Sequence, residues 1–316
     1  MAEKVSVIIP SYNCKYVSRT VDDVFNKATG DIEVIVVLDG YLPNPPIQDR
    51  KNLKIIYREE NLGMRNSINT GVNASSGKYL LKSDDHCSFS DGFDEALVKN
   101  NEEHQVSIPS RYSLDVVNWK IQNEAVSYEY MAYPYRYIDR YRYGIGLFSK
   151  KWEGVHGNDA LNRGNSQYYW RENERKDIKI DEIMIFQGSC WFMPRDHFFS
   201  IGGLNEKLFS TLYQEPAELS FKTWLSGGRV VVNKHCFYAH MHKGRDFGDD
   251  PNIRGYRLDL HAMRETERFG TWYWMNNQWP KATKKMEWLI EKFWPIPGWP
   301  DDWKLQRELW NEKYPH

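Results

Sequence analysis

Short apolar runs alternate with amphipathic stretches in the first part of the chain, and each run stops at polar or turn-forming residues. Residues 5–10, 31–38 and 53–57 are rich in β-branched side chains, which predicts buried strands. Residues 17–26, between the first two runs, carry apolar side chains at helical spacing. Strands that alternate with helices predict parallel βαβ units, so we expect an α/β protein.

One further run ends more abruptly than the others. Residues 77–87 read Gly-Lys-Tyr-Leu-Leu-Lys-Ser-Asp-Asp-His-Cys, an apolar strand that stops at Asp84, Asp85 and His86. Ligands of open α/β sheets collect where the strands end. Asp84 and His86 offer an oxygen and a nitrogen on one side of the chain, which suits Mn²⁺, or Mg²⁺, bridging the diphosphate of a nucleotide. A solvated acidic turn is the alternative.

The second half of the chain predicts more elements and one irregular stretch. Residues 106–115 read as a strand and a loop, and residues 186–194 read as a strand. An amphipathic helix is expected within residues 213–228, with the carboxylate of Glu215 at its start and a Gly-Gly exit into another strand. Residues 128–181 are rich in Tyr, Arg and Asn and show no clear period, which indicates either an insertion that faces a second substrate or a long irregular excursion.

The tail of the chain is unusually rich in tryptophan. Short helices with aromatic stripes are expected over residues 284–293 and 301–311. We expect the aromatic rings to pack the tail onto the rest of the protein. The alternative is an exposed platform that stacks on sugars or bases. The tryptophans concerned are Trp272, Trp274, Trp279, Trp288, Trp294, Trp299, Trp303 and Trp310.

Composition narrows the class of partner and the compartment. The 42 basic and 43 acidic residues nearly cancel, so no global field draws the chain to nucleic acid or to an anionic membrane. The chain starts in a strand without a signal-peptide pattern and has no apolar run of membrane-spanning length. We therefore expect a cytoplasmic protein without a membrane partner. Four scattered cysteines agree with reduced thiols: Cys14, Cys87, Cys190 and Cys236.

Four motifs, in this order, resemble the GT-A nucleotide-sugar domain of family 2 glycosyltransferases. They are Val-Ile-Ile-Pro-Ser-Tyr-Asn, Val-Val-Leu-Asp, Asn-Leu-Gly with Asn-x-Gly after it, and the strand that ends in Asp-Asp-His. The resemblance implies a Rossmann-like GT-A fold over about residues 4–245 and a nucleotide-sugar donor, for which we expect a UDP-sugar. It also implies that the Asp-x-His motif holds the metal. Donor-binding positions within these motifs are Pro10, Tyr12, Asn13, Asp39, Asn61, Gly63 and Asp84.

Two sequence runs resemble the catalytic domain of polypeptide N-acetylgalactosaminyltransferases, which are retaining enzymes. These are the Asp-x-His-Cys run around His86 and the Glu-x-x-Glu-Leu-Ser-Phe run that begins at Glu215. The resemblance implies His240 as a third metal ligand, with His242 as its competitor because residues two apart lie on one face of a strand. A zinc site is the alternative, although its spacing matches no common structural pattern: His235, Cys236, His240 and His242.

Carboxylates and basic side chains complete the predicted site. Glu215 and Asp85 are the predicted catalytic carboxylates. Glu215 would deprotonate the acceptor hydroxyl in an inverting enzyme, would orient acceptor or sugar in a retaining one, or would only complement the helix dipole. Lys82 stands where the resemblance implies an apolar residue, and it is expected to contact phosphate or sugar. Lys243 and Arg245 are expected to neutralise the departing diphosphate, with solvated loop positions as the alternative.

Arg65 has two interpretations. Its position after the Asn-Leu-Gly motif predicts a contact with the base or phosphate of the donor. Alternatively, it pairs only with Glu59 or Glu60, which lie close in the sequence.

Together these features predict a metal-dependent glycosyltransferase that moves a sugar from a nucleotide-sugar donor to an acceptor hydroxyl, with retention. Residues 1–245 would form the catalytic domain, 128–181 its acceptor-facing insertion and 246–316 an aromatic extension. The acceptor would be a glycan or a small molecule. A hydroxymethylated DNA base is the alternative acceptor, with phosphate contacts from a basic groove. The groove would contain Arg136, Arg140, Arg142, Lys150 and Lys151.

Two alternatives involve no sugar transfer. A nucleotidyltransferase would normally carry a Gly-rich basic loop after the first strand, and residues 10–15, Pro-Ser-Tyr-Asn-Cys-Lys, do not form one. A catalytically inactive nucleotide-sugar sensor is the other alternative.

Overall fold

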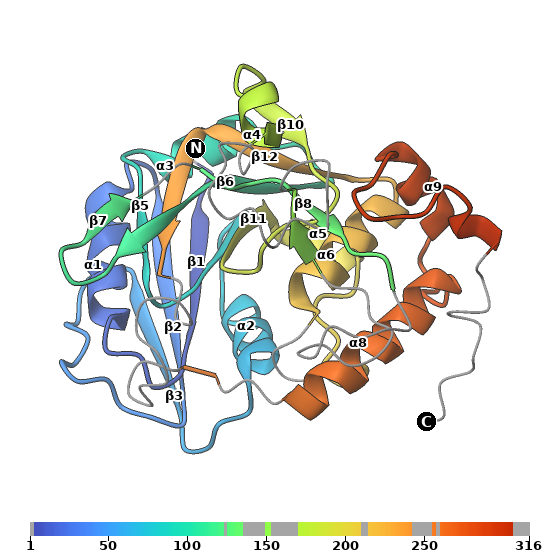
Figure 1. The fold of residues 1–316 in the computed structure, drawn as a ribbon. Helices are drawn as coiled ribbons and strands as arrows, with labels where there is room; N and C mark the ends of the chain where they lie inside the picture. The colour runs from blue at the N-terminus through green and yellow to red at the C-terminus, as the bar shows by residue number, and fades with distance from the viewer. Residues whose placement is uncertain are drawn as a thin grey trace.

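A ten-stranded mixed sheet runs through the centre of the protein, and helices pack around it (Figure 1). The computed structural model describes residues 3–122, 125–134, 149–152, 170–209, 214–241, 255–256 and 260–305. The sheet is built on eight strands, which are β1 (Val5–Ser11), β2 (Ile32–Asp39), β3 (Leu53–Arg58), β4 (Tyr79–Ser83), β6 (Gln105–Asp115), β10 (Ile180–Glu182), β11 (Cys190–Pro194) and β12 (Arg229–His240). Their order across the sheet is β10-β12-β6-β11-β4-β1-β2-β3.

Four short strands complete the β-structure that is described. β5 (Cys87–Phe89) pairs with β12, and β7 (Lys120–Gln122) pairs with β6. A separate two-stranded sheet contains β8 (Glu129–Met131) and β9 (Ser149–Lys151).

Strand direction brings several strand ends to one edge of the sheet. The predicted parallel units are confirmed: β1 pairs in parallel with β2 and β4, and β2 with β3. β11 runs antiparallel to both β4 and β6, while β12 runs parallel to β6. Because β11 reverses direction against each neighbour, β12 runs the same way as β4. The last residues of β1, β2, β4 and β12 therefore lie at the same edge.

Burial explains why the apolar runs form these strands. Val7, Ile8 and Ile9 of β1 have no exposed surface, and residues 34–37 of β2 are equally covered. Helix α2 packs on β1 and β2, and α1 packs on β5. The helices are α1 (Val17–Lys27), α2 (Met64–Asn73), α3 (Phe93–Lys99), α4 (Trp170–Glu174), α5 (Arg195–Ser200), α6 (Glu215–Leu225), α8 (Leu260–Met275) and α9 (Met286–Lys292), with a 3₁₀ turn η2 (Trp303–Leu305).

Two predicted elements are shorter than expected. The strand predicted over residues 186–194 begins only at Cys190, because a turn precedes it in which the Gln187 side chain accepts a hydrogen bond from the Ser189 amide at 2.8 Å. Of the helix predicted over residues 301–311, the described part contains only η2, and residues 306–311 lie outside the described ranges.

The C-terminal aromatic residues pack on the rest of the protein, far from α1 and β7 (Figure 1). The Trp274 ring has no exposed surface and lies edge-on to Phe221 of α6. Trp299 donates a hydrogen bond from Nε1 to the carbonyl oxygen of Met131 at 2.7 Å. α8 was not predicted, because its Thr, Gly and aromatic residues have low helix propensity. Packing of its aromatic side chains stabilises it instead.

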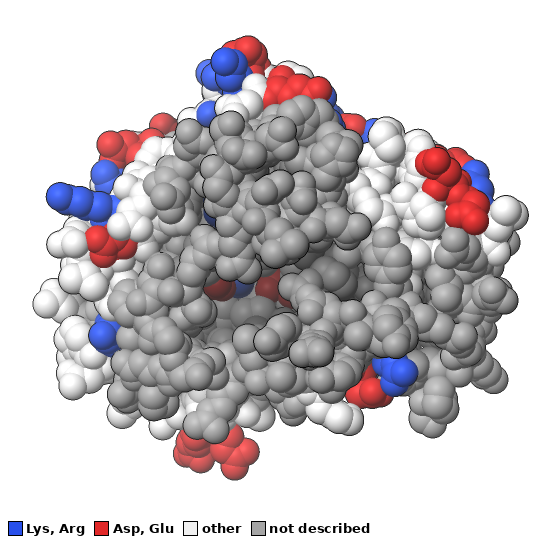
Figure 2. Space-filling model, in the orientation of Figure 1, with Lys and Arg blue, Asp and Glu red and all other residues white. Residues whose placement is uncertain are grey.

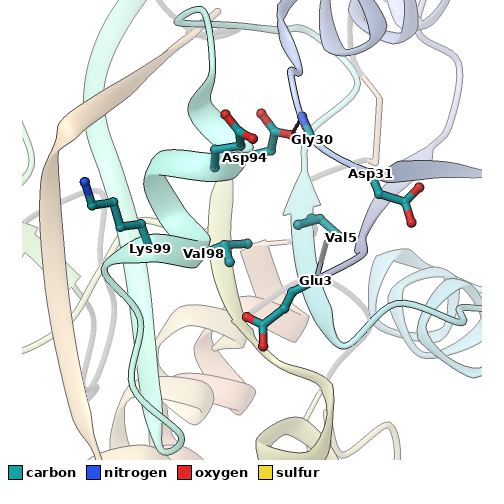
Figure 3. A pocket seen from close by; sticks show the side chains of 8 residues that line it. Glu3, Val5, Gly30, Asp31, Asp94, Val98 and Lys99 are labelled. Carbon is teal, nitrogen blue, oxygen red and sulfur yellow. Dashed lines mark hydrogen bonds between the residues drawn. The ribbon is translucent and has the colours of Figure 1, made fainter. Parts of the chain in front are cut away.

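A cavity of about 340 Å³ lies at the opposite, amino-terminal edge of the sheet (Figure 3). Val5, Gly30 and Asp94 are among its lining residues. Its carboxylate Asp94 accepts hydrogen bonds from the backbone amides of Thr29 at 3.1 Å and Gly30 at 2.7 Å. These bonds anchor the turn that leads into β2. The cavity is therefore separate from the edge where Asp84 lies.

Candidate active site

Three predicted metal ligands meet at the carboxyl edge of the sheet. The ligand atoms of Asp84, His86 and His240 all lie within 4.8 Å of one another. His240 Nε2 is 3.1 Å from Asp84 Oδ2, and the two imidazole rings lie 4.6 Å apart, centroid to centroid. Strand register produces this arrangement, because His240 of β12 is paired with Cys87, the residue after His86. One oxygen and two nitrogen ligands form a set that suits Mn²⁺ or a similar divalent ion.

The alternative zinc site is not formed among the described residues. Only two groups there bring three possible ligands together, and neither contains His235 or Cys236. Both lie within the irregularity of β12 between Asn233 and Phe237, where His235 is exposed and Cys236 is buried. His242, the competing third ligand, lies outside the described residues.

Neighbouring groups stabilise the ionised form of Asp84. Its side chain keeps 22 % of its surface exposed, and Oδ1 accepts a hydrogen bond from Lys82 Nζ at 2.6 Å. Burial alone would raise the pKa of Asp84, but the Lys82 ammonium and the His240 ring hold this pKa below its usual range. On the face shown in Figure 2, a central hollow displays acidic and basic side chains.

Lys82 also connects this ligand to Glu215. Its side chain is fully buried, Nζ donates to the Gly188 carbonyl oxygen at 2.5 Å, and Nζ lies 3.7 Å from Glu215 Oε2. Glu215 begins α6, and its Oε1 accepts a hydrogen bond from Trp191 Nε1 at 2.6 Å. Strand register places Trp191 and Lys82 side by side, because Trp191 of β11 is paired with Lys82 of β4.

The second carboxylate oxygen of Glu215 differs from the first. It is buried, and no hydrogen-bond donor of the described residues reaches it. Burial raises the pKa of Glu215, although the Lys82 ammonium and the Trp191 hydrogen bond oppose part of this increase. The Glu215 carboxylate is therefore only 1 % exposed and is held by Trp191 and Lys82.

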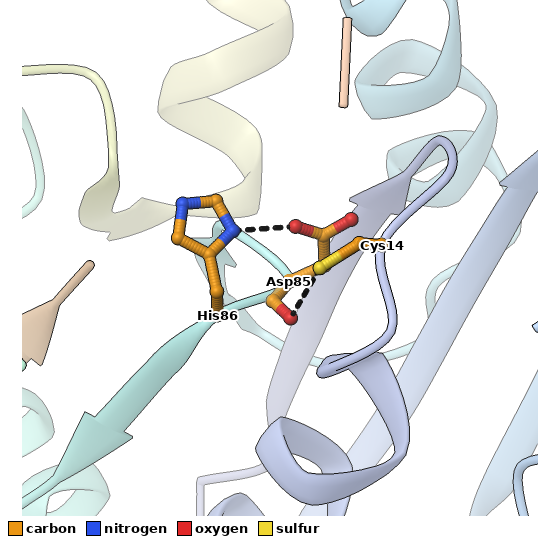
Figure 4. A group of neighbouring side chains, drawn as sticks. All are labelled: Cys14, Asp85 and His86. Carbon is orange, nitrogen blue, oxygen red and sulfur yellow. Dashed lines mark hydrogen bonds and ion pairs between the residues drawn. The ribbon is translucent and has the colours of Figure 1, made fainter. Parts of the chain in front are cut away.

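Asp85 contacts His86 and is not one of the three ligands Asp84, His86 and His240. Its Oδ1 is 2.6 Å from His86 Nδ1, and the Cys14 thiol donates to its backbone carbonyl at 3.4 Å (Figure 4). Cys14, Asp85 and His86 form the second group of possible ligands. The distance between Oδ1 and Nδ1 is that of a hydrogen bond, so no ion fits between these two atoms. The Asp85 carboxylate thus contacts a predicted metal ligand, and its catalytic role stays a prediction.

Asp39, at the end of β2, is fully buried and makes internal contacts. Its carboxylate accepts hydrogen bonds from the amides of Leu62 and Gly63, both at 2.9 Å, and pairs with Arg58 Nη1 at 3.1 Å. The Asn61 side chain accepts from the same Gly63 amide at 2.9 Å. Asp39 therefore shapes the loop of the Asn-Leu-Gly motif, and Arg58 is a partner that sequence reasoning missed.

Aromatic rings gather beside this loop. Tyr12, after β1, has its ring 5.6 Å from that of Tyr256 and 6.2 Å from that of Tyr41. The Tyr256 hydroxyl donates to Ser67 Oγ at 3.1 Å, and burial together with the nearby Asp39 carboxylate raises the pKa of this tyrosine well above its usual value. The motif residues Pro10 and Asn13 flank Tyr12, the first buried and the second exposed.

Arg65 has a buried partner far away in the sequence, and its contact with the donor stays a prediction. Its guanidinium is 1 % exposed and forms an ion pair with Glu218 of α6, and it lies over the ring of Phe209 at 5.2 Å. Glu218 also pairs with Lys222 at 2.6 Å. Neither Glu59 nor Glu60 is its partner in these contacts, and both are exposed. Arg65 thus joins α2 to α6, the helix that carries Glu215.

Arg65→Met is expected to lower the free energy of unfolding by about 3–5 kcal/mol, because it leaves the buried Glu218 charge without this partner. Urea denaturation followed by tryptophan fluorescence measures the change. Arg50→Met is the matched control, since Arg50 pairs with the exposed Asp22 and should cost less than about 1 kcal/mol. Equal stability of the two variants would contradict a structural role for Arg65.

Several predicted positions lie outside the described residues. The diphosphate-binding candidates Lys243 and Arg245 are two of them. Three residues of the predicted basic groove are also outside, and the side chain of a fourth is not described: Arg136, Arg140, Arg142 and Lys150. Lys151, in β9, is the one residue of that group whose side chain is described.

A model of glycosyl transferase family 2 matches residues 6–201. The chain belongs to this family. It is a glycosyltransferase with an α/β fold of the GT-A type, and the predictions of family, fold and enzyme class are confirmed. Within the described ranges, no helix is both long and apolar enough to cross a bilayer.

Curated relatives of this glycosyltransferase include polypeptide N-acetylgalactosaminyltransferases. A putative polypeptide N-acetylgalactosaminyltransferase 13 from Drosophila melanogaster is 22 % identical over 272 residues, which cover 78 % of this chain and 43 % of the relative. Polypeptide N-acetylgalactosaminyltransferase 15 from Homo sapiens is 25 % identical over 203 residues, 62 % of this chain and 27 % of that protein. The chain thus spans less than half the length of these relatives.

Solved structures show the same fold at low sequence identity. GalNAc-T7 with UDP, GalNAc and Mn²⁺ superposes with a TM-score of 0.63 at 14 % identity, covering 92 % of this chain and 56 % of the other. A fragment of S. aureus TarS in complex with UDP-GlcNAc gives a TM-score of 0.54 at 15 % identity, covering 90 % and 69 %.

Proposed function

We propose that this glycosyltransferase transfers a sugar from a UDP-sugar to an acceptor hydroxyl, with a divalent metal and with retention of the anomeric configuration. The observation that carries the proposal is the group of Asp84, His86 and His240 at the carboxyl edge of the sheet, with Lys82 and Glu215 beside it. An ion-binding group and a buried carboxylate at one edge supply the parts that such a transfer requires.

Each group then has a distinct task. Asp84, His86 and His240 would hold Mn²⁺ or Mg²⁺, which supplies stabilisation of the negative charge on the departing diphosphate. Lys82 holds Asp84 in place and carries a positive charge between this ligand and Glu215. Glu215, fixed by Trp191, orients the acceptor or the transferred sugar. The ionised Asp84 and the fixed Glu215 are in place before substrate binds, so little reorganisation is required.

The donor assignment rests on the relatives and on the nucleoside end of the site. GalNAc-T7 was solved with UDP, and TarS with UDP-GlcNAc. We place the nucleoside near Tyr12, Asp39 and the loop of Asn61 and Gly63, because this loop ends at the same sheet edge as the metal group. Lys243 and Arg245 stay proposed contacts of the diphosphate.

Asp39→Ala is expected to weaken binding of UDP about 5-fold to 150-fold. The loop amides of Leu62 and Gly63 lose their acceptor, and such an unsatisfied buried group costs roughly 1–3 kcal/mol. Titration calorimetry measures the affinity. Asp94→Ala is the matched control, because Asp94 also anchors two backbone amides, but at the opposite sheet edge. Unchanged UDP affinity in Asp39→Ala would remove Asp39 from the donor site.

The class of acceptor molecule can be determined by a transfer assay. A screen with radiolabelled UDP-sugars against glycans, small-molecule alcohols, proteins and DNA that contains hydroxymethylated bases would identify the acceptor class. We expect label in a glycan or small molecule. Label in hydroxymethylated DNA would favour the alternative acceptor, and hydrolysis of every UDP-sugar without transfer would contradict all of these acceptors. Membership in the glycosyltransferase family argues against the nucleotidyltransferase alternative.

A further inference from the structure

Asp85 is held between two side chains from different parts of the chain. Its Oδ1 lies 2.6 Å from His86 Nδ1, and its Oδ2 accepts a hydrogen bond from Ser11 Oγ at 2.6 Å. Ser11 is fully buried, and Asp85 and His86 are each only 4 % exposed. We propose that Asp85 is a positioning residue that orients the His86 ring toward the metal, and that Ser11 in turn fixes Asp85. This inference rests on the metal site proposed above.

Hydrogen bonding determines which nitrogen of His86 can bind an ion. An ionised carboxylate accepts hydrogen bonds and donates none, so the Asp85 contact places the proton of the neutral ring on Nδ1. The lone pair then lies on Nε2. In Figure 4 this second nitrogen lies on the side of the ring that faces away from Asp85. Carboxylates in this position fix the orientation of metal-binding histidines and raise their basicity as ligands.

Contacts behind Asp85 explain how it keeps this orientation. Ser11 is the last residue of β1, and its hydroxyl also contacts the hydroxyl of Tyr41, which follows β2. The Cys14 thiol donates to the backbone carbonyl of Asp85 at 3.4 Å. Asp85 is therefore held at its carboxylate and at its backbone. The network also joins the metal ligand His86 to Tyr41, a neighbour of Tyr12 at the nucleoside end.

The test compares Mn²⁺ affinity in Asp85→Asn with that in a matched variant, using the purified full chain. Electron paramagnetic resonance of free Mn²⁺ measures the affinity without a sugar donor. Asp85→Asn should weaken binding about 10-fold to 100-fold, the usual effect of losing a carboxylate behind a metal-binding histidine. Ser11→Ala should weaken it by less, because Asp85 itself stays.

Asp23→Asn is the matched control. Asp23 is also buried and also accepts from a serine hydroxyl, Ser88 Oγ at 2.8 Å, and from a ring nitrogen, Trp119 Nε1 at 2.7 Å. It belongs to neither group of possible ligands. Its variant should lose thermal stability and keep the Mn²⁺ affinity. The visible spectrum of the Co²⁺-loaded protein should change in Asp85→Asn and not in Asp23→Asn, because ligand orientation affects the absorption bands.

The outcomes separate this inference from the proposed function. Wild-type affinity in both Asp85→Asn and Ser11→Ala, with binding lost in Asp84→Ala, would overturn the positioning role and leave the metal site intact. Absence of Mn²⁺ binding by the wild-type protein would overturn the proposed metal site and this inference together. If Asp85→Asn does not fold, a weakened affinity in Ser11→Ala supports the inference, and an unchanged affinity opposes it.

Discussion

Removal of divalent metal by excess EDTA is expected to lower sugar transfer by about a thousandfold or more, and added Mn²⁺ should restore it. The reason is the charge that develops on the departing diphosphate. A metal at Asp84, His86 and His240 would contribute several kcal/mol of stabilisation in the transition state, and each 1.4 kcal/mol corresponds to about a tenfold change in rate. Release of labelled sugar from a UDP-sugar is the measurement.

Two variants make this experiment specific for the predicted ligands. Asp84→Ala should be inactive with or without Mn²⁺, because Asp84 is the only carboxylate among the proposed ligands Asp84, His86 and His240. Asp91→Ala is the control: Asp91 is 82 % exposed and pairs only with Lys27 in the ion pairs described, so full metal-dependent activity is expected. Undiminished transfer by protein shown to be free of metal would contradict the metal site.

The sheet and the metal group could be anticipated because both depend on short sequence patterns. An apolar run that ends at Asp39 or Asp84 predicts a strand and the residue at its end, and parallel pairing brings such ends together. The position of His240 could not be predicted from such a short pattern. Only its register opposite Cys87, 153 residues earlier in the chain (240 − 87), places its ring beside His86. Such a long-range register is not visible in one sequence, so the family resemblance supplied this ligand.

Partners that are distant in sequence account for what could not be predicted. Arg65 was expected to pair with an adjacent glutamate or the donor, yet its partner Glu218 is 153 residues away. Asp39 was expected to face the nucleoside, and its buried partner Arg58 ends the neighbouring strand. Tyr256 packs beside Tyr12, and no local motif predicts this contact. Each of these contacts is determined by tertiary packing, and the helical or strand periodicity of the sequence does not predict it.

The interior of the site also shows why Lys82 could not be assigned from sequence. A lysine in an apolar strand suggested contact with the donor. In the structure its ammonium is fully buried and already bonded to Asp84 and to the Gly188 carbonyl oxygen. A buried charge is tolerated only with such partners. Two of its partners are carboxylates, because Glu215 adds a second negative charge at 3.7 Å.

Glu215→Gln is expected to reduce transfer by less than general-base catalysis requires, to raise the acceptor KM, and to leave the product with the anomeric configuration of the donor. The substitution keeps the size of the side chain and an acceptor for the Trp191 hydrogen bond, but it cannot accept a proton at neutral pH. Loss of a general base costs roughly a hundredfold to ten-thousandfold. A positioning carboxylate should cost less, because the acceptor still binds in a similar orientation.

Glu218→Gln is the control for damage to α6, since Glu218 lies one turn later and is equally buried, but pairs with Arg65 and Lys222. It should lower the stability of the protein while the folded fraction keeps the wild-type acceptor KM. The anomeric coupling constant of the product, measured by NMR, reports the stereochemistry directly. An inverted product, together with a ten-thousandfold loss in Glu215→Gln, would instead identify Glu215 as the general base of an inverting enzyme.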